Sequence, residues 1–316
     1  MEEKRESTVT CPVCPHACHL KEGQAGFCRA RACRDGKIVS ESYGRLTSTA
    51  LDPIEKKPLS DFMPGTTVLS VGSYGCTLRC PFCLNWQIAQ TGEGGVPWKE
   101  VSPIELVASA QRLREKDSFV SGIAYTYNEP LVSWEYVRDC SVLAHQAGLK
   151  NILVSNGCAN EPIIRKLAPL IDAANIDLKG PSQKFYDNCA GDFATVQKTI
   201  EILAATPPCP LAVPPLIVPG MNDKDEDVES IAKWLSEIPT EGDPITLHIT
   251  RFFPRWHMNT DEPTPVETVY HLADVAKNYL DRDRCGNVRN QAGANMREGS
   301  QNICQPSLFV PYWRRT

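Results

Sequence analysis

The stretch that decides the fold is TVLSVGSYGCTLRCPFC, residues 67–83. Residues 67–73 form an apolar run with β-branched side chains, which is typical of a buried strand. A turn containing glycine follows, and then three cysteines, Cys76, Cys80 and Cys83. In proteins with parallel sheets, functional side chains gather where a strand ends and the loop to the next helix begins. The stretch therefore predicts three thiols on such a loop of an α/β protein.

The alternation of strands and helices continues outward from this loop. Residues 102–116 open with a capping box and a proline, and residues 134–147 end before a glycine, as helices do. A third helical pattern at 228–238 has one apolar face with a period of 3.6. Further β-rich runs lie at 118–127, 151–154, 173–177, 211–218 and 245–249. This order predicts right-handed crossovers and a parallel sheet, either closed into a barrel or open.

Composition places the chain among ordinary globular proteins. Its 316 residues are 42% hydrophobic and 22% charged, which is enough for a full core. A formal charge of −5 and a pI near 5.8 give no indication of nucleic-acid binding. No apolar run reaches the roughly 18 residues that cross a membrane, and the charged N-terminus lacks the apolar part of a secretion signal. We expect a cytoplasmic protein whose 14 cysteines are reduced.

A second set of thiols lies near the N-terminus, where turn residues are frequent and periodicity is weak. Its members are Cys11, Cys14, Cys18 and Cys28. The spacing C-x2-C-x3-C-x9-C suits a structural zinc ion, and it equally suits an auxiliary 4Fe–4S cluster. We predict a cysteine-rich extension with a second metal over residues 1–65, and a core domain with a C-terminal extension over residues 66–316. Most of the scattered cysteines fit small buried apolar residues.

The three thiols of the central loop indicate a different chemistry. A structural zinc site closes with four ligands, and no fourth ligand is apparent beside Cys76, Cys80 and Cys83. A 4Fe–4S cluster is held by thiolates, and three in place of four leave one iron free for an external ligand. Phe82, between the last two cysteines, is placed to shield a cluster and to pack against an adenine ring. The pattern favours an iron–sulfur centre with one open position.

CTLRCPFC (76–83) resembles the cluster loop of the radical S-adenosylmethionine (SAM) superfamily, and the resemblance extends over nearly the whole chain. It is strongest to the branch of pyruvate formate-lyase activating enzyme and, within it, to the radical SAM proteins of the AmmeMemoRadiSam system. The supporting stretches are CPVCPHAC (11–18), DPIEKKPL (52–59), AYTYNEP (124–130), SNG (155–157), NIDLKG (175–180), LIVPGMND (216–223) and RFFP (251–254). The resemblance implies a partial (β/α)6 barrel like an incomplete TIM barrel. It also implies a 4Fe–4S cluster on the three cysteines, with SAM on the free iron.

The same resemblance implies an oxidoreductase-like activity. Reductive cleavage of SAM would give methionine and a 5′-deoxyadenosyl radical, which takes a hydrogen atom from an unidentified substrate. A low-potential donor similar to flavodoxin or ferredoxin would supply the electron. Two alternatives are an activase that installs a glycyl radical on a partner enzyme and a metal-binding scaffold without catalysis. The intact cluster motif, with Glu129, Asn156 and Lys179, argues against the scaffold.

Polar residues at the ends of the second and third predicted strands are candidates for holding SAM. Glu129 stands where the superfamily has a turn that contacts the methionyl ammonium, and a carboxylate makes a charge-assisted hydrogen bond to that group. Asn128 adds a further acceptor beside it. Ser155 and Asn156 have the polarity needed for the ribose hydroxyls or the carboxylate.

The later strands contribute further candidates by the same resemblance. Lys179 matches a lysine that pairs with the methionine carboxylate, and Asp177 stands two residues before it. His248 matches a histidine at a strand end that approaches the adenosine. Arg251 and Arg255 flank the aromatic stretch RFFP and are candidates for the substrate mouth.

Overall fold

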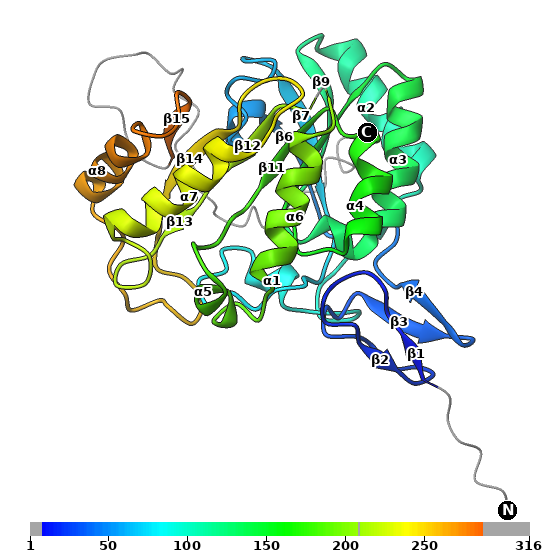
Figure 1. Ribbon diagram of the computed structural model, residues 1–316. Helices are drawn as coiled ribbons and strands as arrows, with labels where there is room; N and C mark the ends of the chain where they lie inside the picture. The colour runs from blue at the N-terminus through cyan, green and yellow to red at the C-terminus, as the bar shows by residue number, and fades with distance from the viewer. Residues whose placement is uncertain (1–7, 208, 287–316) are drawn as a thin grey trace, which may run out of the picture.

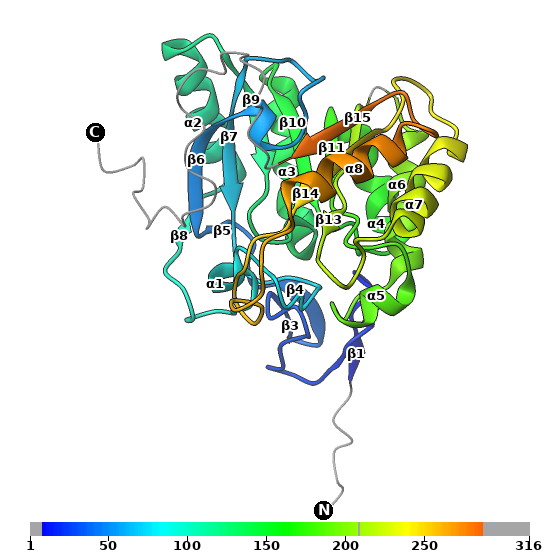
Figure 2. The same ribbon diagram turned by 90° about the vertical axis from the view of Figure 1, so that its left-hand side faces the viewer.

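The structure is a computed structural model that describes residues 8–207 and 209–286. At its centre, six parallel strands are bonded to one another in chain order (Figures 1 and 2). They are β7 (Thr67–Gly72), β9 (Val120–Tyr125), β10 (Lys150–Ser155), β11 (Ala173–Ile176), β12 (Leu211–Val213) and β14 (Thr246–Arg251). The predicted parallel sheet is confirmed, because each strand reaches the next through a helical crossover.

Three further strands complete this sheet. β6 (Ser48–Pro53) runs antiparallel to β7, and β15 (Asp283–Gly286) runs parallel to β14 at the other edge. β13 (Leu216–Ile217) also pairs with β14, because two prolines interrupt the predicted strand 211–218. In the described part of the chain the two edges do not pair with each other, so the sheet is an open, partial barrel.

Helices cover the outer face of this sheet (Figure 1). They are α2 (Pro103–Lys116), α3 (Trp134–Gln146), α4 (Glu161–Leu167), α6 (Phe193–Ala204), α7 (Asp225–Glu237) and α8 (Val266–Ala276). The capping box predicted at the start of the first helix is present: the Ser102 side chain accepts a hydrogen bond from the Glu105 amide. Short helices, α1 (Trp86–Ala89) and α5 (Gln183–Asp187), follow β7 and β11 at the end of the barrel where parallel strands carry function.

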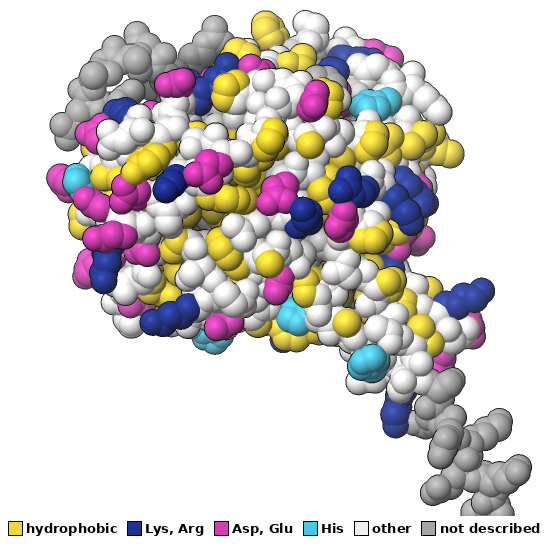
Figure 3. Space-filling view, viewed as in Figure 1, with side chains coloured by type: hydrophobic (Ala, Val, Ile, Leu, Met, Phe, Trp, Pro, Cys, Tyr) yellow, Lys and Arg dark blue, Asp and Glu magenta, His cyan; other side chains and the backbone are white. Residues whose placement is uncertain are grey.

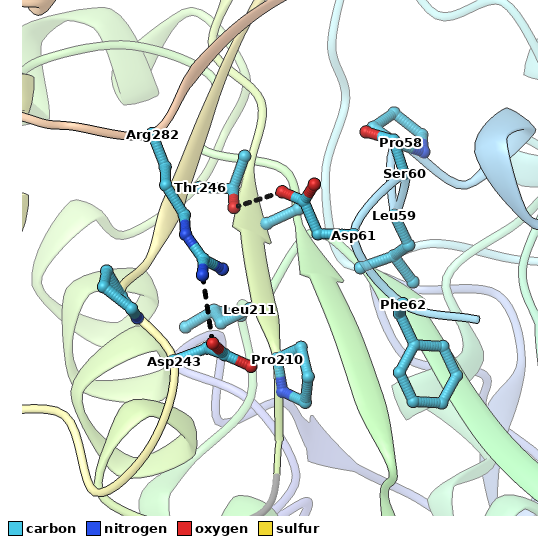
Figure 4. Close-up of a pocket in the computed structure, with 12 residues that line it drawn as sticks. Pro58, Leu59, Ser60, Asp61, Phe62, Pro210, Leu211, Asp243, Thr246 and Arg282 are labelled. Carbon is cyan, nitrogen blue, oxygen red and sulfur yellow. Dashed lines mark hydrogen bonds and ion pairs between the residues drawn. The ribbon is translucent and has the colours of Figure 1, made fainter. Parts of the chain in front are cut away.

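The opposite end of the barrel is filled by the segment that follows β6. Asp61 accepts a hydrogen bond from Thr246 (3.4 Å) and pairs with Arg284 (3.3 Å), which ties the segment to β14 and β15. Figure 4 shows the pocket left at this end, between residues 58–62 and the starts of β12 and β14. The apolar filling is Ile54 and Leu59 packed on Val68, Ala124, Ile152, Ala173 and Ala212 of successive strands. A functional site is therefore expected at the other end of the barrel, where the loops that follow the parallel strands lie.

A small N-terminal unit lies at that other end, near α1 and α5 (Figure 1). It consists of two antiparallel pairs, β1 (Val9–Thr10) with β2 (His19–Leu20) and β3 (Arg31–Arg34) with β4 (Lys37–Ser40). β5 (Arg45–Leu46) then pairs with β8 (Lys99–Glu100). Because β6 already belongs to the main sheet, that sheet begins before the boundary predicted at residue 65. The predicted C-terminal extension lies largely outside the described residues.

Two surface properties bear on possible partners. No helix among the described residues has both the length and the apolar character needed to cross a membrane. Acidic and basic side chains are interspersed over the face shown in Figure 3, without a large patch of one sign. This face offers no continuous basic surface to a polyanion.

Candidate functional site

The loop after β7 brings the three predicted thiols to the end of the barrel beside the N-terminal unit. Gly75 has a φ of +87°, and a Cβ built on it would lie 2.5 Å from the Cys28 carbonyl oxygen. Glycine is therefore required here both for the backbone conformation and for the close approach. The next amide, that of Cys76, donates a hydrogen bond to the same carbonyl (3.2 Å). The two cysteine-bearing segments are in direct contact.

The thiols of the loop lie in a largely buried, mutually interacting group. The Cys76 sulfur accepts hydrogen bonds from the Leu78 amide (3.3 Å) and the Asn156 Nδ2 (3.4 Å). Burial, with a contribution from the neighbouring cysteines, raises the pKa of Cys76 and raises that of Cys83 to about 11. Neutral thiols of this kind become thiolates when a metal binds them.

These residues fit an iron–sulfur cluster in donor type and number. In the described part of the chain no three His, Cys, Asp or Glu side chains form a ready-made metal site. The three thiols are thus neighbours on one loop without forming a closed ligand set. Three thiols on one loop, with a side-chain amide bonded to one sulfur, match a cluster that keeps one iron open.

Cys189 is a neighbour of the site that sequence reasoning missed, since it fitted a small buried apolar residue. Its thiol interacts with Cys80, and this hydrogen bond together with burial raises the pKa of Cys80. Its carbonyl oxygen accepts a hydrogen bond from the Arg79 amide (2.7 Å). No local pattern marks this residue, because only the turn after α5 returns it to a loop more than a hundred residues earlier.

Glu129 lies in the turn after β9 and is 2% exposed. Its carboxylate accepts hydrogen bonds from the Leu131 amide (2.9 Å), the Ser155 hydroxyl (2.7 Å) and the Asn156 amide (2.8 Å). Burial raises the pKa of Glu129 to about 7 against the effect of these bonds, and Asp177 adds to the rise. A carboxylate has about four acceptor positions, so roughly one remains for a ligand.

The side chains of Ser155 and Asn156 also connect neighbouring strand ends. Ser155 accepts a hydrogen bond from the Gly157 amide (2.9 Å) while donating to Glu129. Asn156 donates to the Thr77 hydroxyl (3.1 Å) as well as to Cys76. The structure thus brings these two predicted residues together with Glu129 and the cysteine loop.

Asn128, predicted as a further acceptor for SAM, has its side-chain amide bonded to the cysteine loop. Its Oδ1 accepts a hydrogen bond from the Ser73 amide (2.9 Å), and its Nδ2 donates to the carbonyls of Tyr74 and Gly75 (both 3.1 Å). These bonds occupy the side chain with the backbone just before Cys76. The structure therefore assigns Asn128 to holding the cysteine loop.

Lys179 and Asp177 form an ion pair of 2.7 Å after β11, as their predicted proximity requires. Burial would lower the pKa of Lys179, but Asp177 and the nearby Cys80 raise it, so the amine stays charged. The Lys179 amide donates to the Tyr186 hydroxyl (3.0 Å), which fixes the backbone there. A positive charge is thereby held beside the thiols.

Phe82 is buried in the cysteine loop, whereas His248 is the third residue of β14 and pairs with Arg284 of β15, so it lies inside the strand and not at the predicted strand end. The Phe82 ring lies 6.3 Å from that of Phe185, centroid to centroid. Among the described residues, His248 Nδ1 has no hydrogen-bond partner. Burial lowers the pKa of His248 to about 4, so its imidazole is neutral at ordinary pH.

The loop with Arg251 and Arg255 lies against the cysteine loop. The His257 amide donates to the Pro81 carbonyl (3.0 Å), and Trp256 stacks on Trp86 of α1 at 6.4 Å between centroids. Arg251 Nε donates to the Thr264 carbonyl (2.5 Å), so this guanidinium is already engaged by the protein. The loop covers one side of the site.

The four N-terminal cysteines lie in one folded segment, where the described residues form no closed set of metal ligands. The Cys11 amide donates to the Cys18 carbonyl (2.9 Å), and the Phe27 amide donates to the Cys18 sulfur (3.4 Å). Burial raises the pKa of Cys14 to about 12, with Cys28, Cys158 and Cys11 adding to the rise, and burial together with Cys11 raises the pKa of Cys28. The donors match those that zinc and iron–sulfur clusters require.

Further contacts dock this N-terminal segment on the barrel. The Arg79 guanidinium lies 4.0 Å above the Phe27 ring and also donates to the Phe27 carbonyl. His16 Nε2 contacts the Thr77 carbonyl (2.8 Å). At the start of α4, Asn160 donates from its amide to the Val13 carbonyl (2.9 Å) and from Nδ2 to the Pro12 carbonyl (2.8 Å).

Comparison with known proteins gives matching results at the levels of family and fold. The model of the radical SAM superfamily matches residues 70–235. The chain is 35% identical over 295 residues to the uncharacterized protein MJ0808 of Methanocaldococcus jannaschii, covering 93% of this chain and 86% of that one.

Two solved structures share the fold at low sequence identity. A radical SAM methyltransferase from Sphaerobacter thermophilus superposes with a TM-score of 0.53 at 16% identity, over 70% of this chain and 66% of that chain. SuiB of Streptococcus suis, bound to S-adenosylmethionine, gives a TM-score of 0.52 at 11% identity, over 69% and 49% of the two chains.

Proposed function

Because the chain belongs to the radical SAM superfamily, we propose that Cys76, Cys80 and Cys83 hold a 4Fe–4S cluster that cleaves SAM. Membership identifies an enzyme of the radical SAM class, for which such a cluster and SAM are the expected cofactors. The observation that carries the proposal for these residues is the hydrogen bond from Asn156 to the Cys76 sulfur. It joins the three-thiol loop to the group of polar side chains at the strand ends.

In this proposal the polar groups hold SAM from several sides. Glu129 accepts from the ammonium with its remaining acceptor position, and Lys179 pairs with the carboxylate while Asp177 orients the lysine. Ser155 and Asn156 lie beside the ribose of SAM. Their existing bonds to Glu129 place the group in advance, so little reorganisation is needed on binding.

Aromatic and neutral groups complete the proposed site. Phe82 excludes water from the cluster and packs on the adenine, and neutral His248 offers to the adenosine its Nδ1, which has no hydrogen-bond partner among residues 8–207 and 209–286. Arg255 lies on the same loop and is our candidate for the substrate mouth. Arg251 supports that loop through Thr264.

When bound, the cluster supplies the electron that splits SAM into methionine and a 5′-deoxyadenosyl radical, which abstracts a hydrogen atom from the substrate. The electron comes from a low-potential donor of the flavodoxin or ferredoxin kind. We further place the protein in the activating-enzyme branch and its AmmeMemoRadiSam group, on the motifs given above. We also propose a cytoplasmic location, in keeping with reduced thiols.

The N-terminal cysteines, in our proposal, hold a second metal, either zinc or an auxiliary cluster. Support comes from the spacing of Cys11, Cys14, Cys18 and Cys28 and from the electrostatic interaction of Cys14 with Cys11 and Cys28. The contact between the Cys28 carbonyl and the Cys76 amide makes this segment part of the support of the catalytic loop.

The test is cleavage of SAM by anaerobically reconstituted protein with dithionite as reductant. We expect release of 5′-deoxyadenosine, measured by liquid chromatography, and about four irons per chain beyond any in the N-terminal set. If iron-loaded protein does not cleave SAM, the proposed activity is wrong and the alternative of a metal-binding scaffold without catalysis is favoured. A glycyl-radical signal on a co-purified partner would support the activase alternative, and its absence together with turnover favours a small substrate.

A further inference from the structure

The turn after β9 contains a strained residue, Tyr127, whose φ is +72°. A bulky side chain in this left-handed region is unusual and persists only where surrounding contacts impose it. The neighbouring strand end accommodates the turn through Gly72, where an added Cβ would lie 2.8 Å from the Tyr127 Cβ. Contacts of both its backbone and its side chain keep Tyr127 in this conformation.

The strained backbone has a clear consequence for the cysteine loop. The Tyr127 carbonyl accepts a hydrogen bond from Asn85 Nδ2 (2.7 Å), two residues after Cys83. Asn128 bonds the backbone before Cys76, and the Glu129 amide lies 3.4 Å from the Gly75 carbonyl. The turn thus forms hydrogen bonds to the cysteine loop both before Cys76 and after Cys83. Glu129 follows directly in the same turn.

The Tyr127 side chain is anchored inside the barrel by the DPIEKKP stretch. Its hydroxyl donates to Asp52 Oδ2 (2.6 Å), and the Lys57 ammonium donates to the same oxygen (2.8 Å). That ammonium also lies 4.9 Å from the centre of the Tyr127 ring. The Asp52 and Lys57 side chains are 6% and 5% exposed. The Lys57 carbonyl accepts from Asn175 Nδ2 (2.9 Å), so the anchor spans from β6 to β11.

A buried ion pair is weak support for a fold, because removing two charges from water offsets much of their attraction. Apolar side chains such as Val68 and Ala124 lie in the same buried region, beside the polar Ser70 that also contacts Asp52. Apolar replacements would suit that region for stability alone. A hydrogen-bonded anchor with a defined direction, in contrast, fixes where the Tyr127 ring points.

We propose that Asp52 and Lys57 are positioning residues that hold Tyr127 in its left-handed conformation and so set the geometry of the cysteine loop and Glu129. The idea rests on the proposed function for its consequence in SAM binding, and on the structure alone for its effect on the loop. The DPIEKKP stretch then acts on the site from inside the barrel without touching SAM.

The experiment compares Tyr127→Ala with Tyr127→Gly. Both variants lose the anchor, but only glycine adopts a positive φ without strain. We expect Ala to raise the KM for SAM about tenfold, the equivalent of about 1.4 kcal/mol, with Gly closer to the wild type. If the turn kept its conformation without the anchor, the two variants would have equal KM values and would differ only in stability, because alanine at a positive φ destabilises the folded chain more than glycine does.

A second readout uses metal-free protein and does not depend on activity. Hydrogen–deuterium exchange at the Ser73 amide, which bonds to Asn128, should be faster in Tyr127→Ala than in Tyr127→Gly. Asp52→Asn should shift exchange in the direction of Ala. Tyr125→Phe is the matched control. It removes the buried hydroxyl of the last residue of β9, which bonds Asn151 and Ser141, and it should leave the exchange rate of the Ser73 amide unchanged.

Equal exchange in the Ala and Gly variants overturns the proposal, whether or not the wild type cleaves SAM. Faster exchange in Ala, with no SAM cleavage by any variant, supports the anchor and contradicts the proposed function. The two hypotheses therefore fail separately.

Discussion

Two sets of thiols meet in this molecule, and they differ in what surrounds them. The loop with Cys76, Cys80 and Cys83 is contacted by side chains from other strand ends, such as Asn156. The hydrogen bonds that reach the sulfurs of Cys14, Cys18 and Cys28 come instead from backbone amides. Both sets offer the same kind of ligand, so ligand type does not distinguish the proposed catalytic site from the proposed supporting site. In our proposal, the polar side chains around the thiols and the number of ligands distinguish them.

The largest expected effect follows from the cysteine loop. Cys80→Ala should abolish 5′-deoxyadenosine formation, because two thiolates do not retain a cluster that needs three. Iron content and product are measured on reconstituted protein. Cys209→Ala is the matched control, since Cys209 is a partly buried cysteine outside both sets. Normal turnover in Cys80→Ala would remove the assignment of the loop.

The N-terminal set should respond in a different way. In the double variant Cys11→Ala, Cys14→Ala we expect loss of the second metal and a fall in Tm of about 5 °C, because metal binding and local folding are coupled at such sites. SAM cleavage should fall only in part. Elemental analysis distinguishes zinc from iron, with Cys33→Ala as a control. Unchanged metal content would exclude this set as a site.

Glu129 should make SAM binding at the central site depend on pH. Since burial raises the pKa of Glu129 to about 7, the carboxylate that pairs with an ammonium forms mainly above that pH. SAM affinity should rise about tenfold from pH 6 to pH 8, as the ionised fraction does. Titration calorimetry measures it, and Glu129→Gln should remove the dependence. A flat profile in the wild type would contradict the role.

The same shift has the opposite sign for the stability of metal-free protein. The folded pKa lies above the usual value of 4.5, so the folded state binds the proton more strongly than the unfolded state. This stabilising contribution is full below about pH 4.5 and is lost as the pH rises through 7. The Tm of wild type should decline relative to Glu129→Gln over that interval.

The smallest expected effect concerns the contact between the two regions. Arg79→Met removes the cation above Phe27, a contact worth about 0.5–1 kcal/mol when partly exposed. Together with its lost hydrogen bonds, we expect a loss of about 1–2 kcal/mol in urea unfolding of metal-free protein. Arg138→Met, which removes a similar contact on Trp134, is the control. An equal loss in both variants would mean that the contact between the regions is not special.

Much of this architecture could be predicted from local patterns. The run 67–73 and its successors indicated the parallel strands, and Ser102 indicated a helix start that the structure confirms. Such features depend on neighbours within a few residues. The spacing of the three cysteines likewise concentrates chemistry in one short loop.

What could not be predicted depends on contacts between distant segments. β6 carries no clear alternation, because it is an edge strand with one partner, so its place in the sheet was missed. Cys189 lies beside Cys80 only through the turn after α5. Tyr127 looked like part of a strand end, and its bond to Asp52 joins residues 75 positions apart. No local period encodes such pairings.

The bonds from Asn160 to Pro12 and Val13 have a consequence for how the protein is made. A chain emerging from the ribosome exposes its N-terminal thiols first, yet their docking surface includes the start of α4, which is synthesised about 150 residues later. At a synthesis rate of about 5–20 residues per second, those thiols wait for several seconds or more. During that interval they are open to oxygen, to stray metal ions and to the cell's metal-delivery machinery. This segment is thus synthesised well before the surface on which it docks.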